Sequence, residues 1–207
     1  MDPHVLADAL KEHPETQLVV GIHAETSAGT LHPIAEFARL AHEAGAMFMT
    51  DVVTSLAGCE LEFDEWDLDF AYSGSQKCLA APPGISPVAL SERGLDYIRN
   101  RPKPPTSWYL DLQLIADYWG PDHIAHHTAP VSMIYGLREA VGMALNEGLS
   151  ARWERHAANA SALRAGLRAL NLELPVPEDE RLLPCGTAFV VKTAELMGPE
   201  LLMVSLK

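Results

Sequence analysis

The sequence is poor in cysteine and has no long apolar run. Its three cysteines, Cys59, Cys78 and Cys185, are an odd number without short spacings, which argues against a disulfide framework or a zinc site. Each is expected to be a reduced thiol that packs as a small buried hydrophobic residue. No apolar run approaches the roughly 20 residues of a membrane-spanning helix. The start of the sequence, residues 1–4, has neither the basic n-region nor the apolar h-region of a secretory signal, so a cytoplasmic protein is expected.

Basic residues are also scarce, because 15 lysines and arginines face 28 aspartates and glutamates in 207 residues. The formal charge of −13 repels phosphate backbones and anionic lipid headgroups, so neither nucleic acid nor a membrane surface is an expected partner. Internal repeats and low-complexity segments are absent from the sequence. A hydrophobic content of 48% provides a core for one sizeable domain or two small ones.

Continuous apolar runs alternate with helical patterns in the first half of the chain. The runs at 18–22, 46–53, 68–72 and 87–90 predict strands, and helices are predicted at 5–12 and from Pro33 to a C-terminal stop at Gly45. Because the strand patterns are continuous, they predict strands covered on both faces, as in a mostly parallel sheet of an α/β domain. Ligands in such sheets bind beyond the carboxyl ends of the strands.

The second half of the chain reads as mainly helical. A proline-rich connector at 101–106 precedes a predicted helix at 110–119, and two more are predicted at 130–148, with Pro130 at the first helical position, and at 149–170. The predicted domain boundary lies near Gly148, with domains at 1–148 and 149–207. Beyond residue 172 only 188–191 is predicted as a strand.

Asp51 and Lys77 are the first candidates for a functional site. Asp51 directly follows apolar residues, so it is expected at the carboxyl end of a buried strand, where a carboxylate is costly unless it has a cationic partner. Lys77 follows the next predicted strand, so both side chains are expected at the same edge of the sheet. One interpretation is a structural salt bridge, and the other is a cofactor held between the two groups. The hydroxyl-rich turn at 73–77 and the rigid loop at 78–84 favour the second.

The segment Ser73-Gly74-Ser75-Gln76-Lys77, followed by Ala81-Pro82-Pro83-Gly84, resembles the lysine segment of class V, fold-type I aminotransferases. Segments 23–29, 51–56 and 126–130 resemble the same family in the same order, and the resemblance covers about residues 2–180. It is closest in kind to the alanine–glyoxylate and serine–pyruvate type. It implies that the chain begins with the C-terminal part of the large, cofactor-binding domain. A long helix and the start of a small α+β domain would follow, and this small domain would be truncated or divergent after about residue 181.

The resemblance also implies roles for individual residues. Lys77 would bind pyridoxal 5'-phosphate as a Schiff base and move the proton of the substrate, and Asp51 would keep the pyridine nitrogen protonated. Thr26 would bond the phenolic oxygen, Val53 would pack on the ring, and Gln76 would bond the phosphate. His127 and Thr128 would reach the phosphate of a neighbouring subunit, which implies a homodimer.

For several of these residues a plain structural role is an alternative. Val53 also fits as an ordinary β-branched strand residue, and Thr26 as part of a turn or N-cap ahead of Pro33. The histidines at 123, 126 and 127 are interpreted as polar loop residues and not as metal ligands, because no cysteine or carboxylate cluster completes a plausible set.

The expected reaction moves an amino group from alanine or serine to a 2-oxo acid, either glyoxylate or pyruvate. An alternative is a truncated remnant that acts only as a folded or dimerising module, because no glycine-rich turn precedes the Asp51 segment and no arginine from Arg181 onward matches the substrate-carboxylate arginine of the family. A further alternative is a cysteine desulfurase. Gln76 speaks against it, because those enzymes commonly have histidine before the cofactor lysine.

Overall fold

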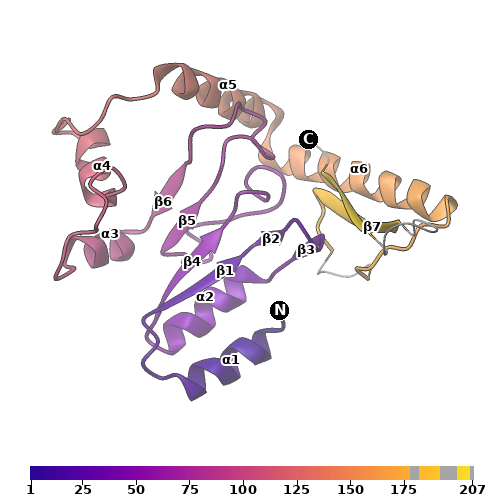
Figure 1. The fold of residues 1–207 in the computed structure, drawn as a ribbon, viewed down its shortest axis with the longest axis horizontal. Coiled ribbons are helices and arrows are strands. Elements are labelled where there is room, and N and C mark those ends of the chain that lie inside the picture. The colour runs from indigo at the N-terminus through magenta and orange to yellow at the C-terminus, as the bar shows by residue number, and fades with distance from the viewer. Residues whose placement is uncertain (178–181, 192–199, 206–207) are drawn as a thin grey trace.

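The computed structural model of the chain describes residues 1–177, 182–191 and 200–205 (Figure 1). The helices are α1 (Pro3–Glu12), α2 (Ile34–Glu43), α3 (Glu92–Arg99), α4 (Leu112–Trp119), α5 (Val131–Glu147) and α6 (Leu149–Ala169). The strands are β1 (Leu18–Ile22), β2 (Ala24–Glu25), β3 (Thr30–Leu31), β4 (Met47–Asp51), β5 (Phe70–Tyr72), β6 (Val88–Leu90), β7 (Gly186–Val191) and β8 (Glu200–Ser205).

The central sheet has the strand order β1-β4-β5-β6. β4 pairs in parallel with both β1 and β5, whereas β6 pairs with β5 in the antiparallel direction. The predicted α/β class with a mostly parallel sheet is confirmed. The parallel arrangement matters for function because it brings the carboxyl ends of β1, β4 and β5 to one edge.

Local signals account for the helix ends that the sequence predicts. α1 begins after Asp2, whose side chain accepts a hydrogen bond of 2.9 Å from the backbone N–H of His4, and Pro3 occupies the first helical position. α2 ends with Gly45 just beyond Ala44, and Gly45 has a φ of +79°, a conformation that glycine adopts without the cost of a Cβ. The predicted stop at Gly45 is confirmed.

Other elements depart from the sequence predictions. The short antiparallel strands β2 and β3, which were not predicted, frame the turn that contains Thr26. α3 was not predicted, although Ser91 caps it by accepting a 3.0 Å hydrogen bond from Gly94 N–H. Pro130 precedes α5 as its N-cap, with a non-helical ψ of 75°, instead of standing at the first helical position. β8 was also not predicted, and it pairs with β7 in an antiparallel hairpin.

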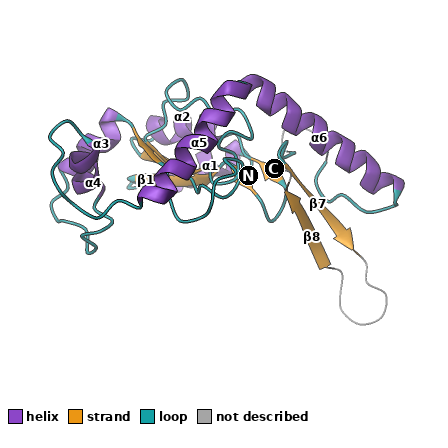
Figure 2. Ribbon diagram, turned by 90° about the horizontal axis from the view of Figure 1, so that it is seen from above, coloured by secondary structure: helices purple, strands orange, loops and turns teal. Residues whose placement is uncertain are grey.

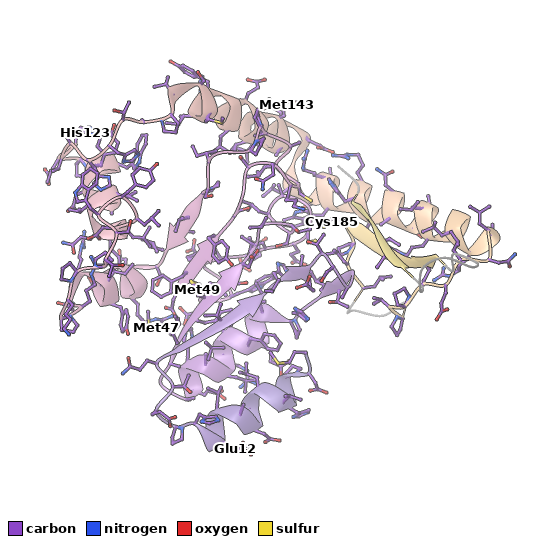
Figure 3. All side chains as sticks on the ribbon, in the orientation of Figure 1. Glu12, Met47, Met49, His123, Met143 and Cys185 are labelled. Atoms are coloured by element: carbon purple, nitrogen blue, oxygen red, sulfur yellow. The ribbon has the colours of Figure 1, made fainter. Side chains whose placement is uncertain are left out.

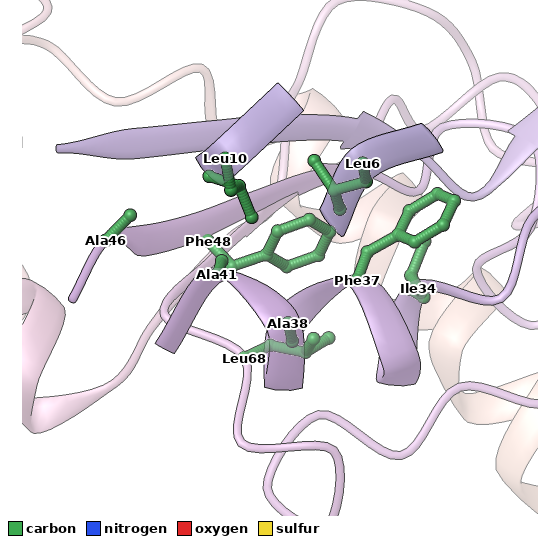
Figure 4. Packing of buried hydrophobic residues seen from close by; sticks show 9 residues of the cluster. All are labelled: Leu6, Leu10, Ile34, Phe37, Ala38, Ala41, Ala46, Phe48 and Leu68. Atoms are coloured by element: carbon green, nitrogen blue, oxygen red, sulfur yellow. The ribbon is translucent and has the colours of Figure 1, made fainter. Parts of the chain in front are cut away.

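The largest hydrophobic core lies between the sheet and the helices α1 and α2 (Figure 4). Phe48 of β4 is fully buried there, together with Phe37 and Ile34 of α2. Gly21 of β1 leaves room for the Phe48 ring, because a Cβ at position 21 would lie 3.1 Å from Phe48 Cζ. One face of the sheet is thus closed by α1 and α2.

The opposite face of the sheet is more open. Leu18, Val20 and Ile22 of β1 alternate with inward-facing residues and are 43%, 55% and 41% exposed. Tyr72 and Val88 of the neighbouring strands are exposed as well. The sequence predicts helices over both faces of the sheet. Among the described residues, helices α1 and α2 cover one face, and the other face remains exposed.

A buried carboxylate joins the strands at the end opposite the candidate site. Asp69 is fully buried and accepts hydrogen bonds from Phe48 N–H at 2.8 Å and from Arg93 Nε at 2.6 Å. His42 Nε2 lies 2.8 Å from Oδ2, the same oxygen that accepts from Phe48 N–H. Burial alone would raise the pKa of Asp69, but these partners outweigh it and lower the pKa. Asp69 thereby ties α2, β4 and α3 together.

The second half of the chain runs along α5 and α6 to the β7–β8 hairpin (Figure 2). Arg152 of α6 is buried and donates to the carbonyl oxygens of Ala57 at 3.1 Å and Cys78 at 2.7 Å. It also forms a 2.8 Å ion pair with Glu147 at the end of α5. α6 is therefore fastened to the loops that follow β4 and β5, close to the candidate site.

The three cysteines lie in a second, smaller core. All three are buried free thiols, and the Sγ atoms of Cys59 and Cys185 are 3.4 Å apart. Hydrogen bonding among the thiols and burial together raise the pKa of Cys78 and of Cys185. The interpretation of these residues as small buried hydrophobic groups is confirmed.

Candidate active site

Three strand ends meet at the carboxyl edge of the sheet. Beyond β1, the N–H of His23 donates to the carbonyl oxygen of Asp51 at 2.9 Å, and beyond β4 the N–H of Val52 donates to Tyr72 at 2.9 Å. The Ser73 hydroxyl donates to the carbonyl oxygen of Val52 at 3.3 Å. The segments that follow β1, β4 and β5 therefore lie side by side, as the sequence predicts for parallel strands.

Asp51 is the last residue of β4 and is half-buried. Its Oδ1 accepts a 2.8 Å hydrogen bond from Val53 N–H. Tyr72 is its register neighbour on β5, and a hydrogen bond between the Tyr72 hydroxyl and the Asp51 carboxylate raises the pKa of Tyr72. Among the described residues, Asp51 forms no ion pair, so the cationic partner expected from the sequence is not found there.

Lys77 lies in a turn that its own backbone closes. Ala80 N–H donates to the carbonyl oxygen of Lys77 at 2.8 Å, Ala81 N–H donates to that of Ser75 at 2.9 Å, and the Ser75 hydroxyl donates to Pro82 at 2.5 Å. The side chain of Lys77 is half-buried and, within the described part of the chain, forms no ion pair. Asp51 and Lys77 thus do not form the structural salt bridge that was the simpler interpretation of the pair.

Gln76 and Thr26 are held close to the same edge. A Cβ at Gly74 would lie 2.7 Å from Gln76 Oε1, so the glycine leaves room for this side chain against the loop. The hydroxyl oxygens of Thr26 and Thr54 are 2.6 Å apart, and Thr54 is buried. This contact joins the Thr26 turn to the segment that contains Asp51 and the half-buried Val53.

His127 and Thr128 are not part of this group. They follow α4 in the loop where His123 lies, which is separate from the carboxyl edge of the sheet (Figure 3). The His127 ring packs on Tyr109 and Tyr118, with ring centroids 5.4 and 5.1 Å away, and its Nδ1 lies 2.8 Å from His126 Nδ1. Among the described residues, no three His, Cys, Asp or Glu side chains are placed to hold a metal ion.

Tyr72, Thr54 and Arg152 are supporting residues that the sequence reasoning missed. The position of Tyr72 could have been inferred from the sequence, because it is the last residue of the predicted strand next to the one that leads to Asp51. The last residues of neighbouring parallel strands lie side by side, as Asp51 and Tyr72 do. Thr54 stood in the motif but had no assigned role. Arg152 gave no local signal, since its partner carbonyls at 57 and 78 are far away in sequence.

A strand-end carboxylate and a loop lysine, at one edge of a mostly parallel α/β sheet, define the class of fold-type I cofactor enzymes. The family model for class-V aminotransferases matches residues 2–196, and the chain belongs to this family. The match extends past residue 180, where the resemblance was predicted to end. Enzymes of the family use pyridoxal phosphate, so the expected cofactor is confirmed at the level of the family.

The similar proteins are aminotransferases. The chain is 37% identical to the (S)-ureidoglycine–glyoxylate transaminase of Bacillus subtilis over 84% of its length, and 37% identical to the alanine–glyoxylate aminotransferase of Callithrix jacchus over 90%. The crystal structure of alanine–glyoxylate aminotransferase from Nostoc sp. superimposes with a TM-score of 0.90 at 36% identity, over 94% of this chain and 51% of that one. The chain spans 46% and 45% of the two curated relatives, about half of each.

None of the helices in the described part of the chain is both long enough and apolar enough to cross a bilayer.

Proposed function

We propose that this chain contributes the part of an aminotransferase active site that contains the cofactor lysine. The enzyme would move an amino group from alanine or serine to glyoxylate or pyruvate. The observation that carries the proposal is the pair Asp51 and Lys77, both half-buried at one sheet edge and neither in an ion pair with a described residue. The relatives support the acceptor, because glyoxylate stands in the names of both the ureidoglycine and the alanine enzymes.

The residues of the edge fit pyridoxal phosphate. Asp51 uses Oδ1 for Val53 N–H, and its second oxygen can accept from a protonated ring nitrogen. Thr26 would present its hydroxyl to the phenolic oxygen, Val53 would pack on the ring, and Gln76 would bind the phosphate. When bound, the cofactor withdraws electrons from the substrate Cα.

The chain's own groups then supply binding and proton transfer. Nζ of Lys77 would hold the cofactor and would carry the proton of the substrate Cα, and the closed turn at 75–82 keeps the lysine backbone in place. The Tyr72 side chain, beside Asp51 in register, would help to orient the Asp51 carboxylate on the side of β5. Arg152 supports the same loop through the Cys78 carbonyl.

Cofactor binding is tested by adding pyridoxal phosphate, reducing with borohydride and locating the pyridoxyl group by peptide mass spectrometry. We expect a visible absorbance band and a borohydride-stable adduct on Lys77. The Lys77→Ala variant should lose the adduct, whereas Lys103→Ala, in the exposed connector, should retain it. A folded protein with no adduct on Lys77 would overturn the proposal.

Turnover is tested with alanine or serine as donor and glyoxylate or pyruvate as acceptor. We expect transamination that falls by at least about 100-fold in Asp51→Asn, because that side chain no longer holds a proton on the ring nitrogen. Sulfide release from cysteine is the matching test of the desulfurase alternative. Sulfide release without transamination would reject the aminotransferase assignment.

We further propose a homodimer in which His127 and Thr128 of one subunit complete the phosphate site of the other. The separation of these residues from the Lys77 edge within one chain motivates the proposal. Mixing inactive Lys77→Ala and Thr128→Ala chains should restore part of the activity, because each hybrid dimer then contains one intact site. A lack of restoration in hybrids that form normally would reject the shared site.

A further inference from the structure

Two neighbouring histidines in the loop before α5 form a chain of hydrogen bonds that ends on a backbone carbonyl. His126 Nε2 lies 3.0 Å from the carbonyl oxygen of Trp108, and His126 Nδ1 lies 2.8 Å from His127 Nδ1. The Trp108 ring packs on His126 with the centroids 4.2 Å apart, and both imidazoles are half-buried. Packing and hydrogen bonds thus hold the two rings in one arrangement.

This arrangement determines where the protons of two neutral rings lie. A carbonyl oxygen can only accept, so Nε2 of His126 carries a proton. A second proton has to lie between the two Nδ1 atoms, because two bare nitrogens cannot hydrogen-bond to each other. Two neutral imidazoles carry two ring protons in total, so none is left for Nε2 of His127. The neutral pair therefore presents a hydrogen-bond acceptor at this nitrogen.

Nε2 of His127 is the open end of the chain of hydrogen bonds. It bonds to none of the described residues, and it is not buried. A phosphate monoester dianion offers only acceptor oxygens, so it cannot hydrogen-bond to a bare ring nitrogen. One added proton turns this end into a donor, whichever of the two rings formally carries the charge. A phosphate group can therefore bind at His127 only together with a proton.

The groups that face His127 are two tyrosines and the neighbouring histidine. Tyr109 precedes α4 and Tyr118 lies within it, with ring centroids 5.4 and 5.1 Å from that of His127. Phenol groups ordinarily keep their proton up to about pH 9. In the described part of the chain, no carboxylate forms an ion pair with either histidine, and Arg101, ahead of α4, is paired with Asp111 at 2.7 Å. The contacts on the page thus leave the histidine pair as the group that takes up the proton.

We propose that the His126–His127 pair binds the cofactor phosphate of the neighbouring subunit with the uptake of one proton, and that His126 is the positioning residue that makes this proton necessary. This role rests on the proposed shared site, in which His127 and Thr128 reach that phosphate. The proton lies between Nε2 of His127 and a phosphate oxygen. Ordinary imidazoles and phosphate monoesters have both lost this proton at about pH 8, so it is taken from solvent.

The positions of the ring protons are measured without any ligand, by long-range proton–nitrogen correlation NMR of the unmodified protein at about pH 8. We expect the proton of His126 on Nε2 and that of His127 on Nδ1. His123, exposed in the same loop, provides the reference for an imidazole in contact with solvent. A proton on Nε2 of neutral His127 would overturn the inference, whatever the outcome for the proposed function.

Proton uptake is measured by isothermal titration calorimetry with 4'-deoxypyridoxine 5'-phosphate in buffers of different ionisation enthalpy. This analogue lacks the carbonyl group and cannot condense with Lys77. We expect the parent protein to take up about one proton more than His126→Gln or His127→Gln. In the first variant His127 is free to carry its proton on Nε2, and in the second the amide donates, so both bind without the uptake.

The pH dependence provides a second measure of the same proton. Between about pH 7.5 and 9, the affinity of the parent should fall about tenfold per pH unit more steeply than that of either variant. His123→Gln, at the exposed position, should match the parent. A merely structural role of His126 would weaken binding without changing the proton count.

The outcomes separate this inference from the function on which it rests. Equal proton uptake in the parent and both variants would overturn the inference and leave the shared site standing. Failure of the parent to bind the analogue would reject the shared phosphate site, and the proton uptake with it. The NMR measurement decides the positions of the protons even if a variant does not fold.

Discussion

The two faces of the central sheet differ in how they are covered, although the strands read alike in sequence. On the side of α1 and α2, Phe48 and Gly21 lie in a closed core, whereas on the other side Leu18, Val20 and Ile22 are 41–55% exposed. The run at 18–22 is apolar throughout, so its composition alone predicts burial on both faces. The comparison shows that apolar composition indicates a strand suited to burial but does not identify the element that covers it.

The largest expected effect comes from removing the aromatic ring at the centre of the covered face. Phe48→Ala should lower the free energy of unfolding by about 3–5 kcal/mol, because a large cavity would open among Phe37, Ile34 and Leu68. Leu18→Ala on the open face should cost less than about 1.5 kcal/mol. Urea unfolding monitored by circular dichroism measures both, and equal losses would remove the distinction between the two faces.

The next effect concerns the buried carboxylate that ties the covered face to α3. Asp69→Asn should destabilise the fold by about 3 kcal/mol, because charge-assisted hydrogen bonds to Arg93 and Phe48 N–H are weakened. The pKa of Asp69 is lowered in the folded state, so the stability that its ionised form contributes is present above the unfolded value of about 3.9 and is lost below it. Asp64→Asn, at an exposed position, serves as the control in the same unfolding experiment.

A pH effect of up to about 3 kcal/mol is expected from His23, which continues the inward-facing alternation of β1. Burial lowers its pKa to about 4 in the folded state, against about 6.5 when unfolded. The unfolded chain therefore binds the proton first, and the stability present above pH 6.5 is lost as the pH falls toward 4. His23→Gln should flatten this part of the stability profile, whereas the exposed His13→Gln should leave it unchanged.

The smallest effect is expected on the open face. Val20→Thr should change the free energy of unfolding by less than about 1 kcal/mol, because the side chain is 55% exposed and threonine keeps the β-branched shape. Thermal unfolding at several protein concentrations measures this. A loss of several kcal/mol, or one that grows with concentration, would mean that this face is covered in solution.

The part of the candidate site that lies at strand ends or in a short loop motif could be predicted from the sequence. Asp51 and Lys77 were placed from apolar runs and a loop motif, because residues that follow parallel strands converge whatever the details of packing. The hydrogen bond from Tyr72 to Asp51 and the Thr26–Thr54 contact depend on register and loop path, which join residues far apart in sequence. The roles of individual residues toward the cofactor remain predictions that the proposed experiments test.

The sequence by itself determined the alternation of strands and helices, the helix end at Gly45 and the candidate pair Asp51 and Lys77, because these depend on apolar periodicity and on residues close in the chain. Only the tertiary structure decided that Asp51 and Lys77 form no salt bridge, that one sheet face is open, and that His126 lies against the carbonyl oxygen of Trp108. Such features depend on the packing of distant segments and on burial, which local sequence patterns do not specify.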